Sequence, residues 1–514
     1  MKLLKVVTGS LLTLSLIAGC SSGTNGGNVP NATNNGESTL SVSPTAEVVK
    51  NEEKIPISIA AQYWGGPKWA EDHPTIKYLN EKFNVDIELQ LINGTEYNEK
   101  LKVMAASGSL PDFYRVDAAT YITWQDEGAF VELTDLLPNY PNLAEAFPND
   151  HTAVRVLNPS DKLYALPDIS WIVRDTVQVR QDWLDNLGIT LPSEEEFTID
   201  KFYEIAKAFA KEDPDKNGLN DTIGFAANNN AIKNAFGIAN EWIEKDGKLI
   251  PYQTQVEEYK AYLAFMNKAY NEGVLDQDFV LRKSTEIEEL IKGNKLGIYT
   301  YKNNYNSIIS DIVKNVPEAE PVIVPMAPPV GPTGLRGNTN VAIGMNKQVI
   351  NAKASDEKID RILQILDWWV TEEGTSIMKN GIEGVHYVKN ANGEYEITEL
   401  WEPEMPRFLN SSIFARPGTD FNLYLWTSPE EVKQHEEYTA LAEKYPWPNA
   451  AMGLEFYSET YKQKSGDLNN KFLEATYKII VGDQPIEYIE QASKEWLENG
   501  GEQIIKEINE AAQK

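Results

Sequence analysis

The sequence IPISIAAQYWGGPKWAEDHPTIKYLNEKFNVDIELQLINGTEYNEKLKVMAASGSLPDFYRV, residues 55–116, decides the fold class of this chain. Ile55–Ala61 and Val85–Leu91 alternate apolar and polar side chains, as half-buried strands do, and the short segment FYRV closes the stretch. Between the strands, Thr75–Phe83 and Tyr97–Ala106 have the composition and spacing of helices. Strands that alternate with helices predict a parallel sheet, so we expect an α/β fold.

The same mixture of strands and helices continues towards the C-terminus. Leu163–Arg180 is long and extended and could cross between two domains. Further strands are expected over Gly297–Tyr301, Val322–Pro325 and Val341–Gly344, and further helices from a Thr198 cap to Lys211, over Glu257–Glu272 and over Asp360–Met378. The remainder, Tyr387–Lys514, is expected to be mostly helical.

The first twenty residues have the features of an export signal. A short basic head precedes the mostly apolar run Val6–Ala18, which is too short to span a bilayer and matches a secretory signal peptide. LIAGC, ending at Cys20, then resembles a bacterial lipobox. The alternative is an ordinary secretion signal with an incidental cysteine. Because Cys20 is the only cysteine and lies at the cleavage point, we expect residues 1–19 to be a lipoprotein signal peptide.

Residues 20–54 are expected to be a lipidated Cys20 followed by a disordered tether. The tether is rich in Gly, Asn, Ser and Thr and has few residues able to form a core. Two or more acyl chains, such as palmitate, anchor a protein firmly. We therefore expect the protein on the extracellular face of the cell membrane, attached through Cys20. Without a second cysteine no disulfide can form, so stability must come from core packing.

The amino-acid composition limits the classes of partner that the chain can bind. The 77 acidic residues outnumber the 47 basic ones, giving a net charge of −30, which repels nucleic acid and anionic lipid headgroups. A highly anionic ligand is disfavoured as well, unless basic residues cluster locally. The 12 Trp and 24 Tyr provide flat rings that can stack on the apolar faces of sugars. After residue 20 no apolar run is long enough to span a bilayer, so a transport role needs separate membrane partners.

Several segments, in a fixed order, resemble the family 1 extracellular solute-binding proteins, and most of all the large oligosaccharide-binding lipoproteins of Gram-positive bacteria. Together with the lipobox, the resemblance rests on SGSLPDF (Ser107–Phe113), VRQDWLDNLGITLP (Val179–Pro192), DPDKNGLNDTIGF (Asp213–Phe225), NEGVLDQDF (Asn271–Phe279) and GIEGVHY (Gly381–Tyr387) near a YVKNANGEY hairpin. It implies a monomeric binding subunit of an ABC importer, without enzymatic activity. The implied partners are a carbohydrate, transmembrane permease subunits and, through them, an ATPase.

The resemblance also implies the architecture. Proteins of this family have two α/β lobes of the periplasmic-binding-protein type II fold, with a hinge and a ligand cleft between the lobes. The chain crosses the hinge more than once, so each lobe is discontinuous. With crossings placed near Asp168 and Val324, and a later one near Gly384, lobe 1 would contain residues 55–168 and 324–384. The helix-rich lobe 2 would contain residues 169–323 and 385–514.

The loop after the helix that ends at Lys211 has oxygen-bearing side chains at the spacing of an EF-hand calcium loop. The predicted ligands are the side chains of Asp213, Asp215, Asn217 and Asp221 and the backbone carbonyl of Leu219. Gly218 permits the sharp turn, but position 12, where an EF-hand has Glu, is Gly224. The alternative is a polar turn whose Asx residues bond their own backbone. Related loops hold a structural calcium, so the resemblance favours Ca²⁺ as a structural cofactor.

Ligands of α/β sheets bind at the carboxyl ends of the strands, and sugars need aromatic rings beside polar groups that pair with hydroxyls. The candidate ligand-binding residues chosen on this basis are Tyr63, Trp64, Trp69, Asp112, Trp171, Arg174, Tyr301, Asn303, Asn340, Trp368, Trp401, Arg416 and Trp426. For each aromatic residue, core packing is about as good an explanation. Trp183 and Trp369 are expected in the core, whereas Trp368 could reach the cleft.

Two other functions are weighed against carbohydrate capture. A surface polysaccharide-degrading enzyme would need a carboxylate pair at a defined separation, which sequence alone does not exclude. HExxH, GxSxG and Walker motifs are absent, and no two of the four histidines have metal-ligand spacing. A protein that presents its ligand to a sensor kinase, or one that binds peptides, would use the same fold. The sequence therefore hardly distinguishes these roles from carbohydrate capture.

Overall fold

The computed structural model describes residues 53–63, 69, 72–158, 162–167, 175–227, 229–302, 305–340, 343–404 and 423–513. The chain divides into Met1–Glu52 and a compact unit, Glu53–Lys514, and only the second is described below. The predicted signal peptide, Cys20 and nearly all of the tether therefore lie outside the described residues. Within these ranges, none of the helices combines the length and the apolar character needed to cross a bilayer.

The first sheet is built from the N-terminal stretch and one returning strand. Its order is β2-β1-β3-β12-β4, with β1 Ile55–Tyr63, β2 Val85–Asn93, β3 Phe113–Val116, β12 Lys347–Ile350 and β4 Leu166–Pro167. β1 pairs in parallel with β2 and β3, as the alternation of strands and helices predicts. β12 is antiparallel to both β3 and β4, so the sheet is mixed.

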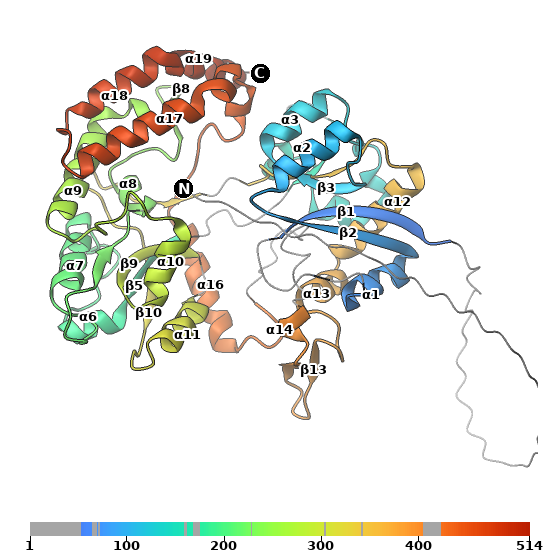
Figure 1. The fold of residues 1–514 in the computed structure, drawn as a ribbon, viewed down its shortest axis with the longest axis horizontal. Coiled ribbons are helices and arrows are strands. Elements are labelled where there is room, and N and C mark those ends of the chain that lie inside the picture. The colour runs from blue at the N-terminus through green and yellow to red at the C-terminus, as the bar shows by residue number, and fades with distance from the viewer. Residues whose placement is uncertain are drawn as a thin grey trace, which may run out of the picture. The chain divides into compact units, whose positions relative to one another are not determined.

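Helices cover both faces of the first sheet (Figure 1). α1 (Pro74–Phe83) and α12 (Asp356–Trp369) pack on one face, where Ile57 is fully buried. α2 (Tyr97–Ser107) and α3 (Ala118–Asp126) pack on the other. Successive residues of β1 contribute to opposite faces, which is the structural reason for the alternation in the sequence.

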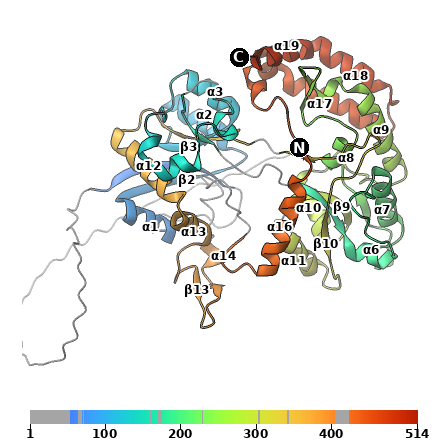
Figure 2. The same cartoon turned by 180° about the vertical axis from the view of Figure 1, so that it is seen from behind.

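The second sheet has the order β10-β5-β9-β6, with β10 Ile323–Met326, β5 Asp175–Arg180, β9 Leu296–Lys302 and β6 Ile223–Phe225. β6 and β9 are parallel, whereas β5 is antiparallel to both of its neighbours. The views in Figures 1 and 2 show α6 (Gln181–Leu187) and α7 (Ile199–Lys211) on one side of this sheet, and α11 (Tyr305–Asn315) and α16 (Pro429–Glu443) on the other.

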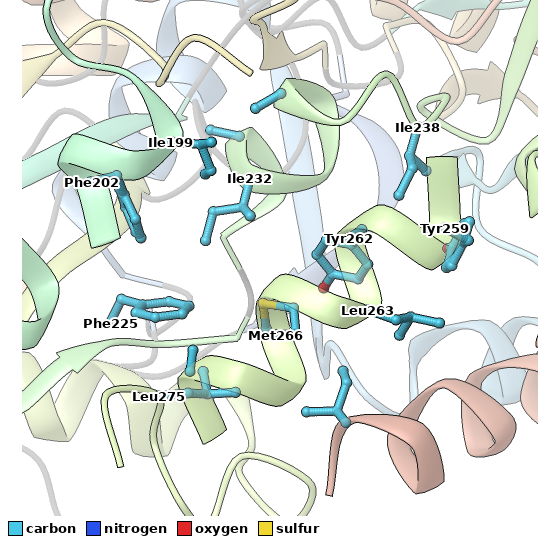
Figure 3. Packing of buried hydrophobic residues seen from close by; sticks show 14 of the residues in the cluster. Ile199, Phe202, Phe225, Ile232, Ile238, Tyr259, Tyr262, Leu263, Met266 and Leu275 are labelled. Carbon is cyan, nitrogen blue, oxygen red and sulfur yellow. The ribbon is translucent and has the colours of Figure 1, made fainter. Parts of the chain in front are cut away.

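The largest core lies beside the second sheet and includes the C-terminal helices. Tyr262, Leu263 and Met266 of α9 (Val256–Asn271) point into it next to Phe225 and Leu275 (Figure 3). α17 (Glu459–Ile480), α18 (Tyr488–Trp496) and α19 (Glu502–Ala511) contribute Phe472, Ile489 and Ile504 to the same core. Trp183 is fully buried here, as expected, and the C-terminal region is mostly helical.

The other elements are short. They are the helices α4 Pro141–Ala146, α5 Thr152–Arg155, α8 Asn230–Ala235, α10 Ser284–Lys292, α13 Glu372–Asn380 and α14 Trp401–Glu404, the hairpins β7 Trp242–Lys245 with β8 Lys248–Pro251 and β13 Tyr387–Lys389 with β14 Tyr395–Ile397, and the pair β11 Asn338–Thr339 with β15 Pro446–Trp447. 3₁₀ turns occur at Leu137–Asn139, Tyr252–Thr254 and Leu454–Tyr457, and a π-helical turn occurs at Leu497–Gly501.

Three local predictions differ from the structure. Val324 lies inside β10, which pairs along its whole length with β5, so the chain returns to the first sheet only between Thr339 and Lys347. Of the strand expected over Val341–Gly344, the first two residues lie outside the described residues and the last two form a turn, with φ +67° at Gly344; strand pairing begins at Lys347. The single helix expected over Asp360–Met378 is two helices, because Thr371 caps α13 by accepting a hydrogen bond from the Gly374 amide.

Candidate binding and metal sites

The predicted ligand residues divide into those that the structure describes and those that it does not. Trp64, Trp171, Arg174, Asn303 and Arg416 lie outside the described residues. Tyr63, which was expected just after the strand, is the last residue of β1 and is half-buried at the carboxyl edge of the first sheet. Its place at that edge agrees with the expected position of ligands in α/β sheets.

Two of the predicted residues have close partners within the protein. Trp69 is buried and stacks on His73, with ring centroids 3.7 Å apart and an interplanar angle of 5°. The carboxylate of Asp112 accepts hydrogen bonds from the Ser58 amide at 2.8 Å and hydroxyl at 2.9 Å, and it forms an ion pair with Lys358 at 2.8 Å. Asp112 therefore joins β1, β3 and α12.

Trp368 packs in the core beside the first sheet. Its indole Nε1 donates to Glu373 at 3.0 Å, and the Lys82 ammonium lies 5.1 Å from its ring centroid. The Tyr78 ring is 5.8 Å away. These contacts join α12 to α1, and Trp369 beside it is buried in the same core.

Two predicted residues, Trp401 and Trp426, come together in an aromatic cluster. The edge of one ring meets the face of the other at 4.6 Å, and Tyr424 stacks on Trp426 at 5.1 Å with an angle of 5°. Tyr387 of β13 completes the cluster at 6.1 Å from Trp426. Trp401 is buried, whereas Trp426 and Tyr424 are half-buried. The two partly exposed rings can offer a flat surface to the apolar face of a sugar.

Tyr301 and Asn340 differ in whether their side chains have hydrogen-bond partners within the protein. The Tyr301 hydroxyl donates to Glu288 at 2.6 Å. Asn340 uses its backbone to pair with Trp447 and Asn240, but its side-chain Oδ1 is buried without a hydrogen-bond partner. A buried polar atom without a partner costs about 1–3 kcal/mol, so Asn340 is the more prominent candidate for binding a hydroxyl.

The predicted calcium loop folds back on itself after α7. Asp213 Oδ2 accepts a hydrogen bond from the Gly218 amide at 3.1 Å, and Gly218 has φ +79°, which favours glycine. The Asn217 amide donates to Asp215 at 2.9 Å and to Asp221 at 3.3 Å. The four predicted oxygen-bearing side chains are thus gathered in one loop.

The electrostatics of the loop fit a cation. Asp213 Oδ1 and Asp215 Oδ1 are buried without hydrogen-bond partners. Burial raises the pKa of Asp215, and the adjacent Asp213 carboxyl raises it further. By contrast, the Lys295 ammonium, 2.5 Å from Asp221, lowers the pKa of Asp221. Unpaired carboxylate oxygens at EF-hand spacing are what a hard cation binds.

A cluster that the sequence spacing did not predict joins His73, His386 and Glu404. Their ligand atoms all lie within 4.8 Å of one another. His386 Nε2 is 2.8 Å from the Glu404 carboxylate, and His73 Nε2 is 3.0 Å from the Glu404 backbone oxygen. Sequence spacing could not reveal this cluster, because 331 residues separate His73 from Glu404.

The hydrogen bonds of this cluster disfavour a metal. The Nδ1 atoms of His73 and His386 accept hydrogen bonds from the amides of Thr75, at 3.2 Å, and Ile382, at 2.8 Å. A neutral imidazole that accepts at Nδ1 carries its proton on Nε2, so Nε2 donates to Glu404 and has no lone pair for a metal. Burial lowers the pKa of both histidines, which keeps the rings neutral.

Comparison with known proteins assigns the class. Residues 75–391 match the family described as bacterial extracellular solute-binding protein, and the chain belongs to that family. The chain is 28% identical over 455 residues to the polygalacturonan/rhamnogalacturonan-binding protein YtcQ of Bacillus subtilis, covering 85% of this chain and 87% of that protein. It is 26% identical over 483 residues to lipoprotein LipO of the same organism, covering 90% and 93%.

Solved structures share the fold. The alginate-binding protein AlgQ2, crystallised without calcium ion, superposes with a TM-score of 0.67 at 21% identity. The match covers 91% of this chain and 100% of AlgQ2. FusA of S. pneumoniae, in complex with kestose, has a TM-score of 0.68 at 17% identity, over 89% and 99%. The predicted α/β solute-binding fold is confirmed by these matches.

Proposed function

We propose that this protein captures a carbohydrate, most of all an oligosaccharide, outside the cell and delivers it to the permease subunits of an ABC importer. The observation that carries the proposal is family membership over residues 75–391. It is supported by 28% identity to a protein named for binding polygalacturonan and rhamnogalacturonan. In the proposal, the two sheets, each of which combines strands far apart in sequence, belong to the two lobes that would close around the ligand.

Sugar recognition in this proposal uses rings and unpaired polar atoms. Trp426 and Tyr424 provide the partly exposed rings, and Asn340 provides a buried acceptor without a partner. Tyr63 lies at the carboxyl edge of the first sheet. The remaining predicted contacts at Trp64, Trp171, Arg174, Asn303 and Arg416 stay part of the proposal.

The proposal includes a structural Ca²⁺ in the loop Asp213–Asp221. The side chains of Asp213, Asp215 and Asn217 and the Leu219 carbonyl would bind it, and Asp221 would join after releasing Lys295. The ion would fix the loop and relieve the repulsion between the buried carboxylates. Thr222 stays outside the set because its hydroxyl donates to the Phe209 carbonyl at 2.7 Å.

The proposal also places the protein on the outer face of the cell membrane, anchored through lipidated Cys20. Its support is the lipobox LIAGC and the 26% identity to a protein named a lipoprotein. In this arrangement the protein binds without chemical conversion and works as a monomer. A hydrolase, a peptide binder and a sensor partner are the alternatives.

The test is a thermal-shift series on Glu53–Lys514, which is a compact unit of its own. The panel contains neutral and acidic mono- and oligosaccharides and short peptides, with product analysis after incubation. A ligand that binds only the folded state raises the midpoint of unfolding. We expect a shift with an oligosaccharide and no new products. Cleavage of the saccharide would favour the hydrolase, and a shift with peptides alone would overturn carbohydrate capture.

A further inference from the structure

A second candidate binding site lies at the carboxyl edge of the second sheet. Leu275 forms a bridge to Phe225, the last residue of β6, so the loop after Leu275 and the chain after Phe225 run beside one another. Between them and α17 lies a pocket of about 200 Å³. Its polar lining consists of Asn230, Lys233, Asp276, Arg282 and Thr476, and its aromatic lining includes Phe279 and Tyr477.

One ion pair in this pocket is already complete. Asp276 is buried, and it accepts from Arg282 Nε at 2.5 Å and from Nη2 at 3.2 Å. Arg282 also reaches Asp278 at 3.3 Å. Asp276 is thereby neutralised and does not supply a counter-ion for the other cation in the pocket.

That other cation, Lys233, has no direct partner. Within the described part of the chain, no carboxylate lies within ion-pair distance of its ammonium and no hydrogen bond reaches it. Lys233 is half-buried, and burial lowers its pKa, although the Glu241 carboxylate raises it again without forming an ion pair. An ammonium that is partly removed from water is stabilised when an opposite charge meets it. The pocket therefore has a place for an anion in a chain whose net charge is −30.

The rest of the lining suits a sugar ring. Phe279 and Tyr477 meet edge to face at 5.5 Å and form an aromatic wall. Asn230 offers an amide that can pair with a hydroxyl.

We propose that this pocket binds the carboxylate of an acidic sugar residue, with the Lys233 ammonium as its counter-ion and the Phe279–Tyr477 wall against the sugar ring. A singly charged group matches Lys233, the one cation among the described lining residues of this pocket that has no direct partner. This inference rests on the proposed capture of carbohydrate and narrows its ligand class to uronate-containing saccharides. It also identifies the local basic site that a strongly acidic protein needs to bind an anionic ligand.

The experiment is titration calorimetry with trigalacturonate and with the methyl ester of the same trisaccharide, which keeps the sugar rings and removes the charge. The protein variants are wild type, Lys233→Gln, Lys233→Arg, and Lys248→Gln as a control. Lys248 is exposed at the start of β8, outside the pocket. Unfolding midpoints are recorded for every variant, and wild type is also titrated at low and high salt.

We expect Lys233→Gln to weaken trigalacturonate binding by about 10- to 100-fold, the usual loss for a hydrogen bond to a charged group, and to leave the ester unchanged. Lys233→Arg should restore part of the affinity, and Lys248→Gln should have no effect. Wild-type affinity for the acid alone should fall with salt. The salt measurement keeps the proposal testable if Lys233→Gln does not fold.

The failures of the two proposals differ. Equal wild-type affinity for the acid and its ester, with no salt dependence, would overturn the carboxylate site and leave carbohydrate capture standing. An equal loss for both ligands in Lys233→Gln would show general damage and would also overturn the site. Binding of neither trisaccharide, nor of any other saccharide in the thermal-shift panel, would overturn both proposals.

Discussion

The imidazole Nε2 of His386 lies 2.8 Å from Oε2 of Glu404 and donates its proton to that carboxylate. The opposite nitrogen of the ring accepts the amide of Ile382, so the fully buried side chain has both of its polar atoms satisfied. His73 bonds to the backbone of Glu404 as well. Together these bonds tie the start of α1 and the turn before β13 to α14.

Replacing His386 with Ala should lower the free energy of unfolding by about 2 kcal/mol or more, because it leaves a buried amide and a carboxylate without partners. Chemical denaturation at pH 7.5 measures the loss. His151→Ala, at an exposed position, is the control and should cost much less. Addition of Zn²⁺ should stabilise neither wild type nor the variant through this cluster. Tight Zn²⁺ binding that His386→Ala abolishes would contradict the hydrogen-bonded assignment.

Glu455 should make stability fall as pH rises towards 7. Its Oε2 is buried without a partner, and burial raises the pKa of this carboxyl from 4.5 to about 7. Because the folded-state pKa is the higher one, its contribution is fully present below about pH 4.5 and is lost as pH rises through about 7. The loss is at most about 3 kcal/mol, from 1.36 kcal/mol per pKa unit.

The measurement is denaturant unfolding of wild type and Glu455→Gln between pH 5 and 8.5. The neutral amide keeps the shape and cannot ionise, so the variant should gain stability relative to wild type as pH rises. Glu357→Gln, on an exposed part of α12, should run parallel to wild type. A constant difference between Glu455→Gln and wild type across this range would refute the prediction.

The predicted calcium loop offers two substitutions that should have opposite effects on Ca²⁺ affinity. Asp215→Asn removes a buried charge that a cation would bind, and it should weaken Ca²⁺ binding by about tenfold or more. Lys295→Met removes the ammonium 2.5 Å from Asp221 and should strengthen Ca²⁺ binding several-fold. Calorimetry with Ca²⁺ after chelation measures both. Asp200→Asn at the start of α7 is the control; equal affinities in all variants would argue for a simple polar turn.

Substitutions of the two tryptophans in the aromatic cluster should have different effects, one mainly on the stability of the fold and the other mainly on saccharide affinity. Trp401 is buried, so Trp401→Ala should cost about 3–5 kcal/mol of stability. Trp426 is half-buried and stacked on Tyr424, so Trp426→Ala should weaken oligosaccharide binding by about tenfold, with a smaller stability loss. Calorimetry and denaturation on both variants test this separation. Unchanged saccharide affinity in Trp426→Ala would remove this residue from the predicted site.

Cys20→Ser should release the protein from the cell membrane into the medium. Without a thiol at this position no acyl chains can be attached, and the anchor is lost. Incorporation of labelled palmitate and fractionation of cells and medium provide the measurement. Ser21→Ala is the matched control and should stay with the membrane. Retention of Cys20→Ser at the membrane would show that the attachment has another basis.

The sequence predicted the parts of the fold that depend on near neighbours. Three predicted features depend only on residues close together in sequence, and all three are present in the structure. They are the alternation in Ile55–Ala61, the Thr198 cap and the Asn-Gly turn of the β13–β14 hairpin. The predicted calcium loop is local in the same sense, since its side chains meet within nine positions. The ion pair of Arg180 with Asp182, at 2.5 Å, likewise joins residues only two positions apart.

Tertiary structure alone decided which strands share a sheet and which distant side chains meet. The sequence of β10 gives no sign that it joins β5 rather than the first sheet, because strand pairing depends on backbone hydrogen bonds between remote segments. The Glu404 cluster and the Lys233 pocket likewise come from packing of remote elements. Burial, which removes water as the competing partner, then determines whether an aromatic or charged side chain serves the core or a ligand.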